Sequence, residues 1–310
     1  MFPRISPWRR RCAPLLLLPV LLGWALAPRA EVEVLASIKP LQLLAQELVG
    51  ERGQVSLLLE PNASPHDYPL KVSDMQRLNN ADLVLWVGEE LETFLSRPLA
   101  RVAPENQLSL AALPDLHWPR YPEESQHPEE PGGHDHGHHH HGRDPHLWLD
   151  PRNGAKVARV LADRLATLDP DNADYYRDRA GALVSELDEL DRSLEARLEP
   201  VAGRGFAVYH QAYGHFVQRY GLNQLTAVTE SPERRPGARH LYELRQRLAG
   251  AACLFTEPYY DMSAARDLAQ ELDLRLGELD LLGASEAVTD YPGLLDTLAD
   301  NVLECLQADS

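Results

Sequence analysis

Short apolar runs alternate with helical segments along the first part of the chain. Residues 31–38, 54–60 and 83–87 are apolar runs of the length that indicates buried strands. Residues 41–49 and 72–80, which lie between them, have the pattern of helices. Strands that alternate with helices form parallel sheets, so the pattern predicts an α/β fold with a parallel sheet.

A similar series recurs in the second half of the chain. Residues 206–209 form a short apolar run, residues 212–220 have a helical pattern, and residues 222–228 again indicate a strand. The segment 77–85 also has a counterpart in residues 247–255. We therefore expect two similar α/β lobes, each with a parallel-sheet core.

One long amphipathic helix is predicted between the two series, because apolar residues recur there at spacings of three and four: Tyr176, Ala180, Leu183, Leu187, Leu190 and Leu194. A helix over residues 172–198 would be roughly 40 Å long, which favours a connection between lobes over an ordinary surface helix. The pattern thus predicts an N-terminal lobe at 31–169, a connecting helix at 170–200 and a C-terminal lobe at 201–310.

The first 30 residues have the features of a secretory signal peptide. Arginines precede an apolar run from Leu15 to Leu26, and small residues follow it up to Ala30, after which we expect cleavage. The run is well short of the ~20 residues needed to span a bilayer. We therefore expect an exported, periplasmic protein that is not itself inserted in the membrane.

The chain is acidic, with a formal net charge of −17. The segment 1–30 contains five arginines and no acidic residue, so its removal would leave a charge of −22. Such a surface repels nucleic acid and anionic lipid and attracts cations, although solubility alone is an equally good reason for it. We expect no nucleic-acid partner.

Cysteine usage fits an oxidising compartment. Cys253 and Cys305 are the two cysteines that remain after removal of the segment 1–30. A lone pair in an exported protein indicates one disulfide rather than two free thiols. We expect it to lie within the C-terminal lobe.

Residues 114–144 are rich in His, Glu, Pro and Gly, and such a segment cannot bury a core. We predict a mobile loop. Its histidines are weak, exchangeable ligands for zinc, copper or nickel: His134, His136, His138, His139, His140 and His141. A purification tag is the alternative, but this tract is internal and interleaved with Asp and Gly.

Isolated histidines offer a sharper site. His66, His146 and His210 lie where predicted strands end, and Asp280 ends the apolar run 274–279. Ligands bind at the carboxyl ends of strands in α/β sheets, so these side chains could meet in a cleft between the lobes. Taken singly, each histidine is more often a core or turn residue than a ligand.

Several motifs resemble those of the ZnuA-type periplasmic zinc receptors, a branch of the zinc and manganese (cluster A-I) substrate-binding proteins of ABC importers. They occur in the family's order over nearly the whole chain after residue 30: Ser64-Pro65-His66-Asp67-Tyr68-Pro69, Ala81-Asp82-Leu83-Val84-Leu85-Trp86, Asp144-Pro145-His146-Leu147-Trp148-Leu149-Asp150, Tyr209-His210-Gln211-Ala212-Tyr213-Gly214 and the segment 277–283. The resemblance implies two α/β lobes joined by a long helix, one tight zinc in the cleft and a mobile His-rich loop.

Carried over to this chain, the resemblance implies that His66, His146 and His210 are the zinc ligands. Related manganese receptors have a carboxylate where His210 stands, and three imidazoles suit zinc better than manganese. The fourth ligand is left open between Asp280, a water molecule and, less favourably, Glu60.

The resemblance implies that the protein, a monomer, delivers Zn²⁺ to an inner-membrane ABC permease with its cytoplasmic ATPase. Two other classes are less well supported. A zinc enzyme could use three histidines and an open position, but neither an HExxH nor a Gly-x-Ser-x-Gly motif is present, and we expect no enzymatic activity. A surface adhesin of the same fold would need a lipid anchor, and Cys12 precedes the apolar run instead of following it.

Overall fold

The computed structural model describes residues 31–120, 143–230, 238–260 and 262–307. The predicted signal peptide and the six histidines of the His-rich tract lie outside these ranges. No helix among the described residues is both long and apolar enough to cross a membrane.

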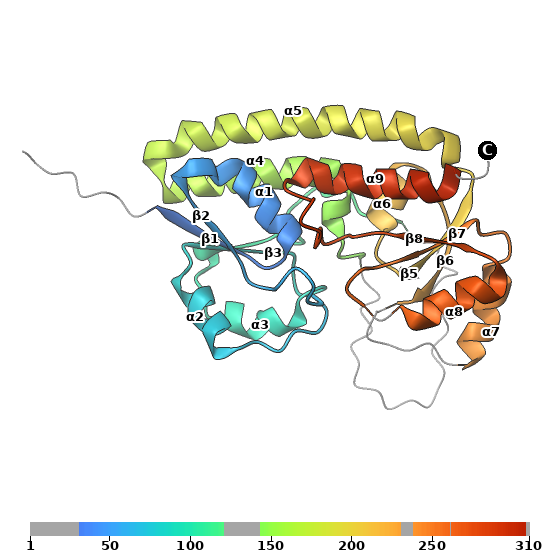
Figure 1. Ribbon diagram of the computed structural model, residues 1–310. Helices are drawn as coiled ribbons and strands as arrows, with labels where there is room; N and C mark the ends of the chain where they lie inside the picture. The colour runs from blue at the N-terminus through green and yellow to red at the C-terminus, as the bar shows by residue number, and fades with distance from the viewer. Residues whose placement is uncertain (1–30, 121–142, 231–237, 261, 308–310) are drawn as a thin grey trace, which may run out of the picture. The chain divides into compact units, whose positions relative to one another are not determined.

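The N-terminal lobe is built around a parallel sheet of four strands in the order β2-β1-β3-β4 (Figure 1). Its strands are β1 (Val32–Ala36), β2 (Gly53–Leu57), β3 (Leu83–Trp86) and β4 (Gln107–Ser109). β1 and β3 lie in the middle of the sheet, and nearly all of their side chains are buried. Both were predicted from their apolar runs.

The C-terminal lobe repeats this arrangement with a parallel sheet in the order β6-β5-β7-β8. Its strands are β5 (Gly205–His210), β6 (Asn223–Thr229), β7 (Cys253–Thr256) and β8 (Arg275–Glu278). The prediction of two similar lobes with parallel-sheet cores is therefore confirmed.

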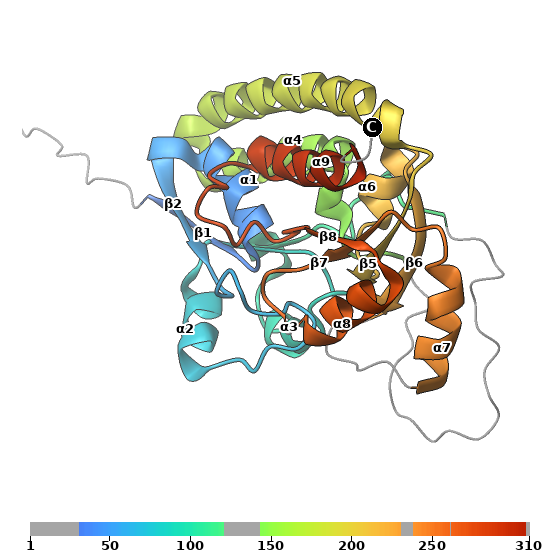
Figure 2. The ribbon, with the colours of Figure 1, turned by 45° about the vertical axis from the view of Figure 1, so that its right-hand side comes forward.

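Helices lie on both sides of the two sheets, as Figures 1 and 2 show. On one side lie α1 (Lys39–Val49), α4 (Pro151–Leu168) and α9 (Tyr291–Gln307), and on the other lie α2 (Val72–Asn80), α3 (Thr93–Leu99), α7 (Ala238–Arg247) and α8 (Ser263–Leu272). A short helix, α6 (Gly214–Arg219), follows β5. Single 3-10 turns complete the chain: η1 (Gly50–Arg52), η2 (Pro104–Asn106), η4 (Leu147–Leu149), η5 (Pro170–Asn172) and η6 (Glu199–Val201).

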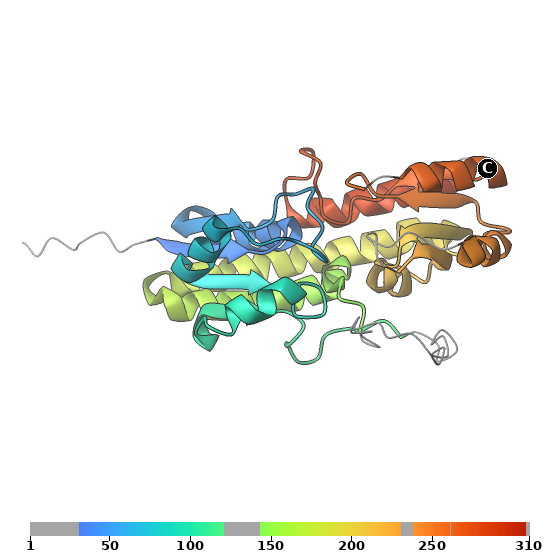
Figure 3. The same ribbon diagram turned by 90° about the horizontal axis from the view of Figure 1, so that it is seen from below.

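The predicted long helix is α5 (Ala173–Leu198), which runs alongside both lobes (Figure 3). Near its start, Arg179 donates to the backbone carbonyl of Glu47 on α1. Near its end, Arg197 forms an ion pair with Asp296 on α9. The helix is thus attached to both lobes by charged side chains, in addition to its buried apolar stripe.

Hydrogen bonds join the lobes close to the predicted site. The indole N–H of Trp148 donates to the carbonyl of Leu281 at 2.9 Å, and the hydroxyl of Tyr291 donates to the carbonyl of Trp148 at 2.5 Å. Gly154 is required beneath this contact, since a Cβ there would lie 2.5 Å from the ring of Tyr291. These buried bonds fix the segment after His146 against the C-terminal lobe.

A disulfide joins Cys253 at the start of β7 to Cys305 on α9. The pairing predicted from the sequence is confirmed. It attaches the last helix of the chain to a central strand of the second sheet.

Candidate metal centre

His210 is the last residue of β5, a central strand of the second sheet. The residues before it, from Phe206 to Tyr209, are buried, so the strand is held firmly in the core of the C-terminal lobe. His210 therefore projects from the carboxyl end of its strand, which is the position expected from the sequence.

His66 lies in the turn between β2 and α2, nine residues beyond the end of β2. Its backbone N–H donates to the hydroxyl of Ser64 at 3.2 Å. The neighbouring Pro61 and Asp67 are exposed, whereas the Nε2 atom of His66 is buried. The turn thus presents an inward-facing imidazole from a segment that is partly exposed.

His146 precedes η4, and no strand among the described residues ends directly before it, so the strand-end prediction was wrong for this residue. The three residues after it, Leu147, Trp148 and Leu149, are buried and anchor the segment. Asp150 then caps α4 by accepting the backbone N–H of Arg152. Burial of this short apolar turn positions His146, and no strand is needed.

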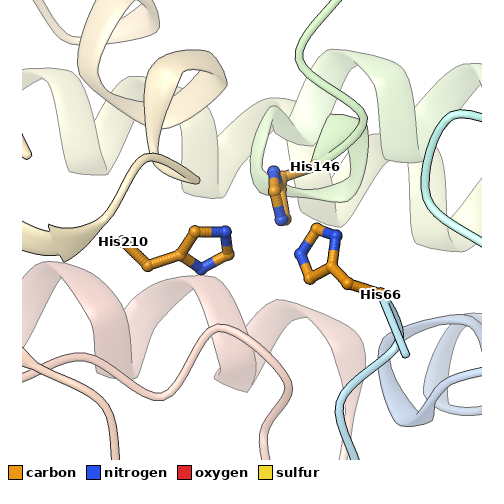
Figure 4. A group of neighbouring side chains, drawn as sticks. All are labelled: His66, His146 and His210. Atoms are coloured by element: carbon orange, nitrogen blue, oxygen red, sulfur yellow. The ribbon is translucent and has the colours of Figure 1, made fainter. Parts of the chain in front are cut away.

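The three imidazoles converge on one point (Figure 4). One ligand atom from each of His66, His146 and His210 lies within 4.8 Å of the other two. All three Nε2 atoms are buried and have no hydrogen-bond partner. Tetrahedral zinc–nitrogen bonds of 2.0–2.1 Å would place such atoms roughly 3.3 Å apart, so a small inward movement would suffice to coordinate one ion.

Burial disfavours the protonated forms of His66 and His146. Burial, followed by the proximity of His146 and His210, holds the pKa of His66 well below its usual range. Burial also lowers the pKa of His146, although the carboxylate of Asp144 opposes this effect. Neutral imidazoles carry the lone pairs that a metal ion needs, so the site is prepared for a cation near neutral pH.

Asp144 orients His146. One of its carboxylate oxygens lies 2.7 Å from Nδ1 of His146 and accepts the backbone N–H of the same residue. Its other oxygen accepts the backbone N–H of Gly214, four residues after His210. Burial alone would raise the pKa of Asp144, but the hydrogen bond and charge of His146 outweigh it and lower the pKa. A carboxylate that receives Nδ1–H leaves Nε2 of His146 for a metal.

Glu257 lies beside His210, with its Oε1 3.3 Å from Nδ1 of the imidazole. The carboxylate is buried, and neither of its oxygens has a hydrogen-bond partner in the described structure. The sequence pattern alone did not indicate a role for Glu257. The signal was present in the strand register, because Val208 pairs with Phe255 and the next two residues along each strand bring His210 opposite Glu257.

Asp280 and Glu60, the other candidate ligands, lie outside the three-histidine group. Asp280 is buried, with one oxygen accepting the backbone N–H of Ser285 at 2.9 Å and the other without a partner. Glu60 is exposed, in the turn that leads to His66. His215 is buried but engaged elsewhere, since its Nε2–H donates to the carbonyl of Asp144.

Two parallel-sheet lobes joined by a long helix, with three convergent histidines supplied from both of them, define the class of two-lobed metal-binding receptors. The chain belongs to the ZnuA family, described as the periplasmic component A of zinc-uptake complexes, whose family model matches residues 34–305.

Relatives and solved structures agree with this assignment. The chain is 36% identical over 294 residues to the high-affinity zinc uptake system protein ZnuA of Yersinia pestis, covering 90% of this chain and 92% of that protein. It is 34% identical to the protein of the same name from Paracoccus denitrificans, over 95% and 98% of the two chains. A zinc-bound deletion mutant of ZnuA superposes with a TM-score of 0.74 at 25% identity, covering 90% of this chain and all of that one.

Proposed function

We propose that this protein captures Zn²⁺ in the periplasm and hands it to an inner-membrane ABC permease with its cytoplasmic ATPase. The observation that carries the proposal is the convergence of three buried, unpartnered imidazole nitrogens from His66, His146 and His210. Family membership and the printed names of the zinc-uptake relatives support the same function.

The donor set favours zinc over harder ions. Three imidazole nitrogens suit zinc, copper or nickel, whereas manganese and magnesium favour oxygen ligands. Copper binds such a set more tightly than zinc in solution, so selection for zinc depends on geometry and on which metals the periplasm supplies.

Asp280 is our candidate for the fourth ligand. Its side chain is 8% exposed and has one buried oxygen without a hydrogen-bond partner, which is a costly arrangement unless a cation or proton approaches it. A bound water is the alternative, with exposed Glu60 the weakest candidate. Asp280→Asn should weaken zinc binding at least tenfold if the carboxylate coordinates the ion, whereas a water ligand predicts a change of less than about twofold.

The rest of the chain fits an exported receptor. We propose that residues 1–30 are a signal peptide, and that the mature protein is a monomer with lobes at 31–169 and 201–310 joined by the helix at 170–200. The His-rich loop at 114–144 would bind further, weaker zinc ions through its histidines.

We propose that the protein has no enzymatic activity. Three histidines and an open position also occur in catalytic zinc sites, where the metal activates water. The chain belongs to a zinc-uptake family, which argues against catalytic turnover at this site. We expect the zinc-loaded protein to hydrolyse ester substrates no faster than free zinc does.

Isothermal titration of metal-free protein with zinc tests the proposed function. Wild type should bind one ion tightly and several more weakly, and deletion of residues 128–142 should remove only the weaker ones. His66→Ala and His210→Ala should abolish tight binding and keep the weaker sites. A tight equivalent that survives both substitutions would show that the three histidines are not the receptor site.

A further inference from the structure

Glu257 is a buried acid whose position is not explained by the fold. It follows β7 directly, and its side chain is 2% exposed. Both carboxylate oxygens are buried and lack a hydrogen-bond partner among the described residues. An unpaired buried carboxylate costs several kcal/mol as a rule, so a residue kept in this state needs a compensating role.

The neighbouring hydroxyl groups also bind other partners. Tyr213 donates its hydroxyl to the carbonyl of Leu279 at 3.1 Å. The hydroxyl of Tyr259 accepts the backbone N–H of Leu282 at 3.2 Å. Oε1 of Glu257 lies 3.3 Å from Nδ1 of His210. Burial and, after it, the nearby Glu257 raise the pKa of the Tyr213 hydroxyl.

The strand register fixes this pairing. β5 and β7 are adjacent parallel strands, with Phe206 opposite Cys253 and Val208 opposite Phe255. Two residues further along both strands, His210 and Glu257 leave the sheet side by side at its carboxyl end. The pair therefore lies at the carboxyl end of the two central strands of the C-terminal lobe.

The other side of the site has a matching pair, because Asp144 accepts Nδ1–H of His146. The two carboxylates come from opposite lobes and each meets the Nδ1 side of a different histidine. His146 and His210 thereby direct their unpartnered Nε2 atoms toward the same point.

We propose that Glu257 is a positioning residue for His210, and that its negative charge stabilises the dication held by the three histidines. This role rests on the proposed zinc-receptor function. A hydrogen bond from Nδ1–H of His210 to Oε1 of Glu257, which lies 3.3 Å away, would leave Nε2 of His210 for the metal. The metal ion would be the positively charged partner that the carboxylate of Glu257 does not have in the metal-free protein.

This role predicts effects of opposite sign on the metal-free and zinc-bound forms. Glu257→Gln keeps the size of the side chain and an oxygen acceptor but removes the charge. Zinc affinity should fall about tenfold or more, as it does when partners of metal-binding histidines are changed. The thermal unfolding midpoint of the metal-free protein should be unchanged or higher, because the substitution removes an unpaired buried charge.

The experiment measures zinc affinity by chelator competition and the unfolding midpoint of metal-free protein for four proteins. Glu278→Gln is the matched control, since it removes the same charge from an exposed position on β8 of the same lobe. Glu257→Asp, which keeps the charge, should retain more affinity than Glu257→Gln. Wild type and the control should bind one zinc equally tightly.

The outcomes separate the two proposals. Zinc affinity of Glu257→Gln within twofold of wild type would overturn the role of Glu257 and leave the receptor function standing. A lower affinity accompanied by a lower metal-free midpoint, and not rescued by Glu257→Asp, would show a merely structural residue. Lack of a tight zinc ion in wild type itself would overturn the receptor function, and this role with it.

Discussion

The imidazole of His215 donates its Nε2–H to the backbone carbonyl of Asp144 across 2.9 Å, joining the start of α6 to the segment that carries His146. The side-chain amide of Asn153 approaches the other ring nitrogen of His215 at 3.4 Å. Asp144 in turn accepts the backbone N–H of Gly214. One histidine that is not a candidate ligand thus ties together the two segments that supply His146 and His210.

His215→Ala should destabilise the protein by roughly 3 kcal/mol, because it leaves a buried carbonyl unsatisfied and a cavity beside it. Zinc affinity should also fall several-fold, since Asp144 loses a restraint. Urea denaturation and zinc titration measure the two effects. His240→Ala is the control: His240 makes a similar 2.9 Å bond to the carbonyl of Val228 but is exposed, so its loss should cost less than about 1 kcal/mol.

Asp144→Asn should weaken zinc binding by about 10- to 100-fold. The neutral amide stabilises the metal-bound imidazole of His146 less than the carboxylate does. The two oxygens of Asp144 accept the backbone N–H groups of His146 and Gly214, and the NH2 group of the amide cannot accept either of them. Competition with a zinc chelator measures the change. Asp174→Asn, on the exposed face of α5, should bind zinc like wild type. Equal affinity of both variants would contradict the orientation of His146 by Asp144.

Stability should depend on pH through Glu92. Burial raises the pKa of this carboxyl from 4.5 to about 7, although backbone N–H groups of Val87 and Gly88 donate to it. The folded state therefore keeps a proton that the unfolded state loses above pH 4.5. This contribution to stability is greatest below pH 4.5 and is lost as the pH rises through 7, at a cost of about 3 kcal/mol by pH 8.

Glu92→Gln removes this titration. Its free energy of unfolding relative to wild type should rise between pH 5 and pH 8 and level off above that. Urea denaturation of metal-free protein at four pH values in this range measures the difference. A difference that stays flat with pH would show that Glu92 ionises freely in the folded protein.

Reduction of the disulfide should lower the stability of the C-terminal lobe. Cys253 and Cys305 are 52 residues apart, and closing a loop of that length stabilises a fold by roughly 4 kcal/mol through the entropy of the unfolded chain. A double Cys→Ala variant should therefore unfold at lower urea concentration than the oxidised wild type. Wild type in strong reductant should approach the variant, whereas identical midpoints under all conditions would exclude a stabilising bond.

Much of the fold was predictable because the central strands are largely apolar and the buried face of α5 is apolar except for Asp191. Several helices that cover the sheets were not predicted, namely α3, α4, α7, α8 and α9. In α4 the buried face includes Asn153 and Gly154, which interrupt an apolar pattern. Their places are set by contacts to His117, Leu147 and Tyr291, which lie far away in the sequence or in other elements.

The three histidines were predicted as a group, chiefly from motifs that resemble those of a known family. Strand position alone was sufficient for His210 only. Glu257 could not be assigned because its link to His210 depends on which strands are neighbours, and sheet order is not written in local patterns. Asp280, Glu60 and the His-rich tract remain predictions.

X-ray absorption at the zinc edge tests the central claim most directly. The sample is protein lacking residues 128–142, loaded with one equivalent of zinc, so that the loop histidines His134, His136 and His138 to His141 are absent. The account predicts three imidazole nitrogens at about 2.0–2.1 Å, a fourth oxygen ligand and no sulfur, with one imidazole fewer in His210→Ala. A spectrum with fewer than three imidazoles, or one unchanged in His210→Ala, would contradict a zinc site formed by His66, His146 and His210.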